Sequence, residues 1–120
     1  MKSYRDLDVY KLAYELAMEV HNMTMQLPKY ELYEQGSQIR RSTKSIKDNI
    51  AEGYGRKMYK ADFIRFLIFA QASCDEATSQ LEMINELYFE KEGLDSLLER
   101  YDKLGRQLNK FIQYVQTNWK

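Results

Sequence analysis

The sequence predicts an all-α protein: an antiparallel up-down-up-down four-helix bundle that forms a single domain over residues 1–120. Apolar residues recur at steps of three and four over four long segments, which is the spacing of one helix face. One Pro and five Gly leave little material for the many tight turns of a sandwich or barrel. The connections, around 28–34, 54–60 and 91–94, are short enough to favour antiparallel neighbours.

The first two segments each have one apolar face and a recognisable end. The first face consists of Val9, Leu12, Leu16, Val20, Met23 and Leu27. Pro28 is expected to end this helix, because its ring disfavours helical geometry in the preceding residue. The second face consists of Ile39, Thr43, Ile46, Ile50 and Gly53. We expect Gly53 to close this helix in the left-handed conformation that is typical of helix C-terminal caps.

The third and fourth segments continue the same spacing on either side of Gly93. The third face consists of Phe63, Leu67, Ala70, Cys74, Ala77, Leu81, Ile84 and Tyr88. Asp62, or a residue just before it, is expected to cap the start of this helix. The fourth face consists of Leu94, Leu97, Tyr101, Leu104, Leu108, Phe111 and Val115.

The third segment carries more apolar surface than its core face requires. Ile64, Ile68 and Phe69 point away from that face on a helical projection. A helix that is apolar on most sides is buried on most sides, so these residues predict an interface in a homo-oligomer. The alternative is that Ile64 and Ile68 only flank the internal core.

The net charge is zero, with 18 basic and 18 acidic side chains, but the charges are unevenly distributed. Residues 40–65 carry 8 basic and 3 acidic side chains, whereas residues 66–100 carry 2 basic and 8 acidic ones. Blocks of opposite sign indicate surfaces that meet each other or a charged partner. Solvated helix faces are the simpler explanation.

The second segment holds the candidate residues for binding nucleic acid or a partner. Arg40, Lys44 and Lys47 share one helix face, which we call the basic ridge. The full candidate set is Arg40, Arg41, Lys44, Lys47, Arg56 and Lys57. These side chains suit contacts with phosphates, with Tyr54 and Tyr59 nearby for base stacking. They equally suit pairing with the acidic third segment of a neighbouring subunit, or simple solvation.

Catalytic and metal-binding motifs are lacking in the sequence. His21 is the single histidine, which excludes multi-histidine metal motifs and conventional catalytic dyads. Cys74 falls on an apolar face, as an inert buried thiol does. We therefore expect no enzyme, no cofactor and no metal. The lone cysteine, the absence of an export leader and the lack of an apolar run long enough to span a bilayer predict a cytoplasmic protein.

A family resemblance adds to these inferences. The stretch 38–56, which reads QIRRSTKSIKDNIAEGYGR, resembles the signature of the bacterial four-helix-bundle proteins encoded in intervening sequences of large-subunit rRNA genes. Further matches are Leu7, Val9, Tyr10, Lys11, Ala13, Leu27, Pro28, Glu31, Asp62, Phe63, Arg65, Phe66, Leu67, Ala70, Ser73 and Glu76. The accessory variability determinant of diversity-generating retroelements is similar to the same family.

The resemblance implies a homopentameric ring of four-helix bundles with a central channel and without known catalysis. It also implies association with RNA or a ribonucleoprotein. The expected function is thus a non-enzymatic, RNA-associated oligomer that uses the basic ridge. The alternative is a protein-interaction scaffold without direct nucleic-acid binding, in which the same residues build the ring or hold a protein partner.

Overall fold

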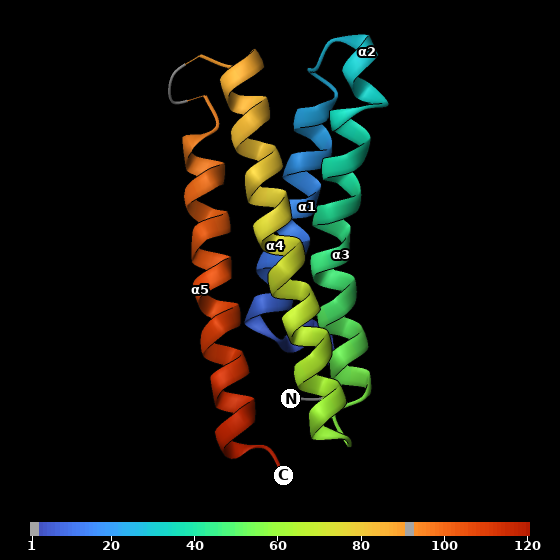
Figure 1. The fold of residues 1–120 in the computed structure, drawn as a ribbon, viewed down its shortest axis with the longest axis vertical. Helices are drawn as coiled ribbons and strands as arrows, with labels where there is room; N and C mark the ends of the chain where they lie inside the picture. Colours follow the sequence, from blue (N-terminus) through green and yellow to red (C-terminus); the bar gives the residue numbers. More distant parts are fainter. Residues whose placement is uncertain (1–2, 91–92) are drawn as a thin grey trace.

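The computed structural model describes residues 3–90 and 93–120, and these form helices without a strand. A 3-10 helix, η1 (Tyr4–Asp6), precedes α1 (Asp8–Thr24), the short α2 (Lys29–Leu32), α3 (Gln35–Gly55), α4 (Lys60–Tyr88) and α5 (Asp95–Asn118). Figure 1 shows the four long helices α1, α3, α4 and α5 aligned along one axis, and the sequence colours run alternately up and down them. The predicted all-α four-helix bundle is confirmed. Part of the expected 91–94 connection lies outside the described residues.

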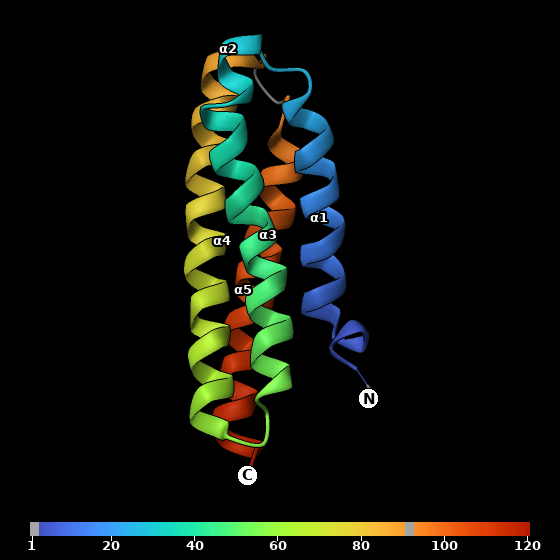
Figure 2. The same ribbon diagram turned by 90° about the vertical axis from the view of Figure 1, so that its right-hand side faces the viewer.

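The long helices form a square in which α3 has the most extensive contacts. α3 packs most extensively on α4 and also contacts α1, α2 and η1. α4 packs on α5, and the contact between α1 and α5 is the smallest of the four. Figure 2 shows α3 in front of α5, with α4 and α1 at the two sides. The bundle is therefore built outward from the α3–α4 pair.

The core contains the apolar faces that the spacing predicts. Nearly every predicted residue is buried, and Leu12, Tyr88 and Phe111 are partly buried against the same core. Ile112 is buried beside Phe111, although the spacing does not place it on the predicted face. α1 ends at Thr24, before Pro28, so Leu27 reaches the core from the following turn rather than from the helix.

The expected connection 28–34 contains α2, which a polar cluster fixes to the end of α4. Glu31 is only 8% exposed, and its carboxylate accepts hydrogen bonds from the Tyr88 hydroxyl and from the Gln35 amide. These hydrogen bonds, of which the one from Tyr88 has the largest effect, hold the pKa of Glu31 below its ordinary value. Glu31 therefore joins α2, α3 and α4 at one end of the bundle.

The expected left-handed cap at Gly53 is wrong. α3 continues to Gly55, and Gly53 has no left-handed backbone conformation. A Cβ atom at Gly53 would lie 3.1 Å from the Phe66 Cβ and 3.2 Å from the Phe63 carbonyl oxygen. Glycine is required here because α4 approaches α3 closely, not because the chain turns.

The expected cap at Asp62 is also corrected. Tyr59 precedes the first residue of α4 and makes no side-chain capping bond. Asp62 lies in the first turn, where it accepts a hydrogen bond of 3.1 Å from Arg65. A carboxylate in the first turn interacts favourably with the helix dipole, so Asp62 still stabilises this helix start.

Substitution of Gly53 tests the close approach of α3 and α4. Gly53→Ala should be less stable than Gly55→Ala by about 1–3 kcal/mol, because its added methyl group meets backbone and Cβ atoms of α4. Gly55→Ala is the matched control, since it also exchanges Gly for Ala in α3 and no atom lies within 4 Å of its added Cβ. Thermal denaturation measures both variants. A Gly53→Ala variant as stable as Gly55→Ala would contradict the close approach as the reason for glycine at position 53.

Glu31 makes the stability depend on pH in a defined direction. Because its pKa is lowered by folding, its stabilisation is present above the ordinary Glu pKa and is lost as the pH falls through the folded value. Glu31→Gln should therefore lower the melting temperature at pH 7, and the difference from the wild type should shrink steadily as the pH falls below the ordinary Glu pKa. A difference that does not change with falling pH would contradict this role of the charge.

Candidate nucleic-acid and partner interface

Arg40 of the basic ridge is part of the internal framework. Its guanidinium donates from Nη1 to the Thr24 hydroxyl and from Nη2 to the Leu32 carbonyl oxygen, each at 2.8 Å. Thr24 ends α1 and Leu32 ends α2, so Arg40 links both helix ends to α3. The half-buried guanidinium is thereby committed to the fold rather than to a ligand.

The other two residues of the basic ridge differ, because, in the part of the chain that the structure describes, Lys47 forms an ion pair and Lys44 does not. Lys47 forms an ion pair of 2.7 Å with Asp48, and its ammonium lies 5.9 Å from the centre of the Tyr14 ring on α1. The hydrogen bond to Asp48 is the main cause that raises the pKa of Lys47. Lys44 is exposed and has no ion pair within the described residues. The ridge is therefore not one free cationic surface.

Arg41 lies on a polar groove between α3 and α4. The groove has a volume of about 510 Å³ and is lined by Gln38, Arg41, Ser42, Ser45, Glu76 and Gln80. The Ser42 hydroxyl oxygen lies 2.8 Å from both Glu76 Oε1 and Gln80 Oε1. Farther along, the hydroxyls of Ser45 and Ser73 lie 2.9 Å apart. Arg41 itself is exposed and forms no ion pair in the described parts of the chain.

Arg56 and Lys57 lie in the turn that joins α3 to α4. Arg56 pairs with Glu52 at 3.1 Å and with Asp62 at 3.7 Å. The Lys57 ammonium lies 3.8 Å from the centre of the Tyr54 ring. Tyr54 is only 7% exposed, so its expected role in base stacking is corrected: its ring belongs to the core. These two cations have partners within the chain.

The three predicted interface residues of α4 separate into two kinds. Ile64 is partly buried against the core, as the alternative interpretation expects. Ile68 and Phe69 are 49% and 44% exposed, and Phe69 also lines the end of the polar groove beside Asn49. Ile68 and Phe69 thus present apolar surface on α4, and Phe69 does so next to the groove that carries Glu76.

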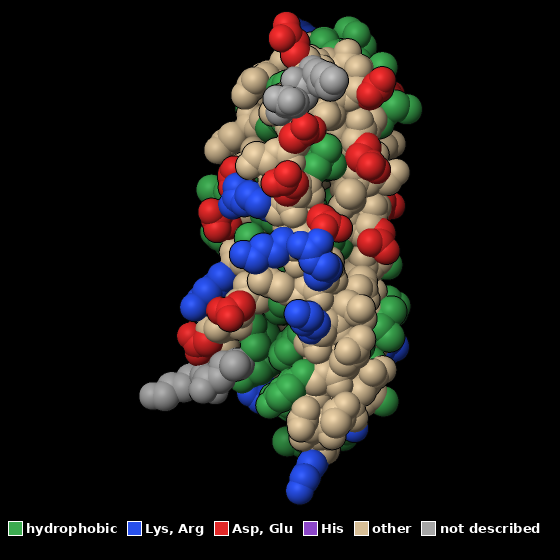
Figure 3. Space-filling model, turned by 90° about the vertical axis from the view of Figure 1, so that its left-hand side faces the viewer, with side chains coloured by type: hydrophobic (Ala, Val, Ile, Leu, Met, Phe, Trp, Pro, Cys, Tyr) green, Lys and Arg blue, Asp and Glu red, His purple; other side chains and the backbone are tan. Residues whose placement is uncertain are grey.

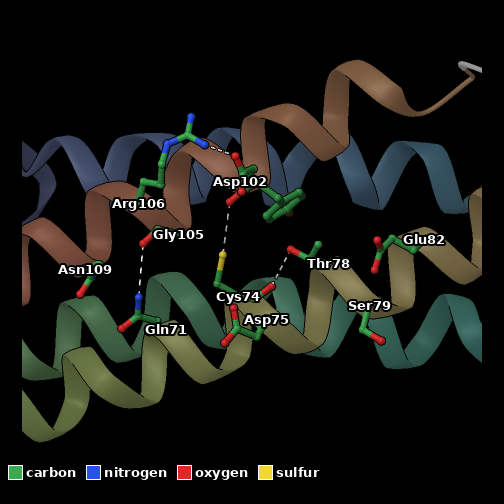
Figure 4. A pocket seen from close by; sticks show the side chains of 11 residues that line it. Gln71, Cys74, Asp75, Thr78, Ser79, Glu82, Asp102, Gly105, Arg106 and Asn109 are labelled. Atoms are coloured by element: carbon green, nitrogen blue, oxygen red, sulfur yellow. Dashed lines mark hydrogen bonds and ion pairs between the residues drawn. The ribbon is translucent and has the colours of Figure 1, made fainter.

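A recess of about 310 Å³ between α4 and α5 has the polar lining of a small site (Figure 4). The Cys74 thiol, which lines this recess, is inert: Cys74 is buried, and burial is the main cause that raises its pKa to about 12. The thiol donates to the Tyr101 carbonyl oxygen at 3.6 Å, and the Gln71 amide donates to the Gly105 carbonyl oxygen at 3.3 Å. Asp102 and Arg106 pair with each other on the rim. The lining side chains thus join two helices.

The remaining titratable groups do not converge on a site. His21 is exposed, Asp75, Glu82 and Glu86 are exposed along α4, and Glu90 is exposed after its end. In Figure 3 acidic side chains gather on the upper half of the α5 side, and basic ones lie below them. Among the described residues no group of His, Cys, Asp or Glu is arranged to hold a metal ion. No helix in these residues has the length and apolarity needed to cross a membrane.

The structure also places two tyrosines of α1 beside the basic ridge, a neighbourhood that the sequence did not predict. Tyr10 and Tyr14 of α1 have ring centres 6.1 Å apart, and Lys47 of α3 approaches Tyr14. The signal was present in the sequence: tyrosines four residues apart share one helix face. Their position next to α3 follows only from the packing of the two helices.

The fold defines the class of protein: an all-helical four-helix bundle, with the candidate cations on α3 and the turn that follows it. Residues 5–110 match the 23S rRNA-intervening sequence protein family, and the chain belongs to it. The resemblance inferred from the 38–56 motif is confirmed by this match.

A solved structure from Bacteroides thetaiotaomicron supports the fold. It is described as a protein with unknown function from the S23 ribosomal protein family, and it aligns with a TM-score of 0.73 and 24% sequence identity. The alignment covers 87% of this chain and 97% of that one. No curated protein matches this chain significantly.

Substitutions of Arg40 and Lys44 test whether Arg40 stabilises the fold while Lys44 does not. Arg40→Gln should destabilise the fold by about 1–3 kcal/mol, because it removes two hydrogen bonds from a half-buried cation. Lys44→Gln should leave the melting temperature unchanged, since Lys44 is exposed on the same helix face. Thermal denaturation followed by circular dichroism compares them. Equal melting temperatures for the two variants would contradict the structural role of Arg40.

Proposed function

We propose that the protein is a non-enzymatic bundle that assembles with copies of itself and associates with RNA or a ribonucleoprotein. The observation that carries the RNA association is the pair Arg41 and Lys44. Both are exposed on α3, and neither forms an ion pair within the described residues. Cations without protein partners are available to phosphates. The family description, which refers to 23S rRNA, supports the same partner class.

Self-assembly is supported by the exposed apolar surface of α4. Ile68 and Phe69 are both exposed on α4, and Phe69 lines a hollow together with Glu76. A neighbouring copy that packs on this surface would cover the apolar side chains. The resemblance to rRNA intervening-sequence proteins supports a ring of five.

Light scattering coupled to size exclusion tests the assembly. The wild type should elute as a multiple of 14.4 kDa, and a variant with Ile68→Ser and Phe69→Ser should shift toward the monomer. Met18→Ser on α1 is the control, because Met18 is similarly exposed but lies on a different helix. A wild-type particle of 14.4 kDa at micromolar concentration would refute self-assembly.

A salt-titrated RNA-binding assay tests the second part of the proposal. Arg41→Gln and Lys44→Gln should each weaken RNA binding and reduce the slope of log affinity against log salt by about 0.7–0.9 for every phosphate that is no longer neutralised. Lys103→Gln on α5 is the matched control, since it removes an exposed charge far along the chain. Unchanged affinity and slope in both α3 variants would exclude these residues as the RNA-binding cations.

The second candidate function is a protein-interaction scaffold without direct nucleic-acid binding. It is favoured by the internal bonding of Arg40, Lys47, Arg56 and Lys57, which, as far as the structure describes the chain, leaves only Arg41 and Lys44 of the six candidate cations for phosphates. A protein that forms the oligomer and has no measurable affinity for RNA would establish this alternative.

A further inference from the structure

Three tyrosines form a continuous aromatic surface along the start of the chain. The rings of Tyr4 and Tyr10 meet edge to face with centres 4.9 Å apart, and Tyr14 follows at 6.1 Å from Tyr10. We call Tyr4, Tyr10 and Tyr14 the tyrosine ladder. Tyr4 and Tyr10 pack partly on the core, which fixes their orientation, whereas Tyr14 is 47% exposed. The ladder is thus a fixed aromatic surface with an open end.

Cations surround the ladder on both of the helices that border it. The Arg5 guanidinium lies 4.6 Å from the centre of the Tyr4 ring, and the Lys47 ammonium approaches Tyr14 from α3. Lys11, one turn into α1, is exposed. Arg5, Tyr10, Lys11 and Tyr14 line a shallow hollow of about 360 Å³. Aromatic and cationic side chains therefore alternate on one small surface.

The acidic side chains that the structure describes near the ladder leave two of its cations without an ion pair. Asp48 pairs with Lys47, and Asp6 accepts from the Ser3 amide in the cap of η1. Glu15 pairs with Arg100 of α5, on the other side of α1. Asp8 is exposed at the start of α1. Arg5 and Lys11 take part in no ion pair within residues 3–90 and 93–120, so both are available to an anionic ligand.

We propose that the tyrosine ladder and its flanking cations bind single-stranded RNA, with a base stacked on Tyr14 and phosphates contacted by Arg5 and Lys11. This inference rests on the proposed association with RNA and specifies the form of RNA and the surface. Stacking on tyrosine requires an open base face, which single strands offer and duplexes do not. Cations beside aromatic rings are the combination that binds unpaired strands without sequence preference.

The test compares a fluorescently labelled oligouridylate with an RNA duplex of the same length. The wild type should bind the single strand more tightly than the duplex. Tyr14→Leu should weaken single-strand binding about tenfold, because the aromatic ring that stacks on the base is removed while apolar volume is retained. Tyr33→Leu is the matched control, since Tyr33 is also exposed and follows α2, outside the ladder. Melting temperatures of both variants should equal that of the wild type.

A second variant tests the charge contribution of the same surface. Lys11→Gln should reduce the salt slope for the single strand by about 0.7. Equal binding of single strand and duplex, or a Tyr14→Leu variant that binds like the wild type, would overturn the inference. If RNA binding then still depends on Arg41 and Lys44, the proposed function stands without it. If neither form of RNA binds, both fail.

Discussion

The close contact between α3 and α4 is the constraint on which the rest of the bundle depends. At Gly53 the missing side chain allows Phe63 and Phe66 of α4 to lie against the α3 backbone. Farther along, the small hydroxyl side chains of Ser45 and Ser73 meet across the same pair of helices. α1 then packs on the other side of α3, and α5 packs on α4. The two outer helices are thus placed by their contacts with this pair.

Because α3 contacts several neighbours, its basic side chains acquire different roles. Arg40 reaches back to the ends of α1 and α2, Lys47 lies toward α1, and Arg41 borders the groove toward α4. A helix with one core face thus presents a structural cation, a cation beside an aromatic ring and two exposed cations. The surface that remains for ligands lies along both edges of α3 rather than on one ridge. The tyrosine ladder lies on the α1 edge of α3, away from the α4 surface proposed for self-assembly, whereas Arg41 lies on the α4 edge itself.

The sequence predicted the fold and core well, because burial of one helix face imposes a spacing that survives in a single chain. It predicted the site less well. The role of Gly53 depends on the neighbouring helix, and a helical projection cannot show that the Arg40 guanidinium bonds to Thr24, sixteen residues away. Likewise, the aromatic ring next to the ridge is Tyr14 of another helix, whereas Tyr54, which is near in sequence, is buried. Contacts between helices determine these side-chain roles, and the spacing of apolar residues in the sequence does not reveal such contacts.

Native-state hydrogen exchange tests the central claim that the α3–α4 pair organises the bundle. Amides in the middle of α3 and α4 should exchange most slowly, through global unfolding, whereas those of α5 should exchange earlier, through local opening. This order is expected because α5 has one extensive interface, with α4, and only a small one with α1. Amides of α5 that exchange as slowly as those of α3 would contradict the account, since the four helices would then open as one unit.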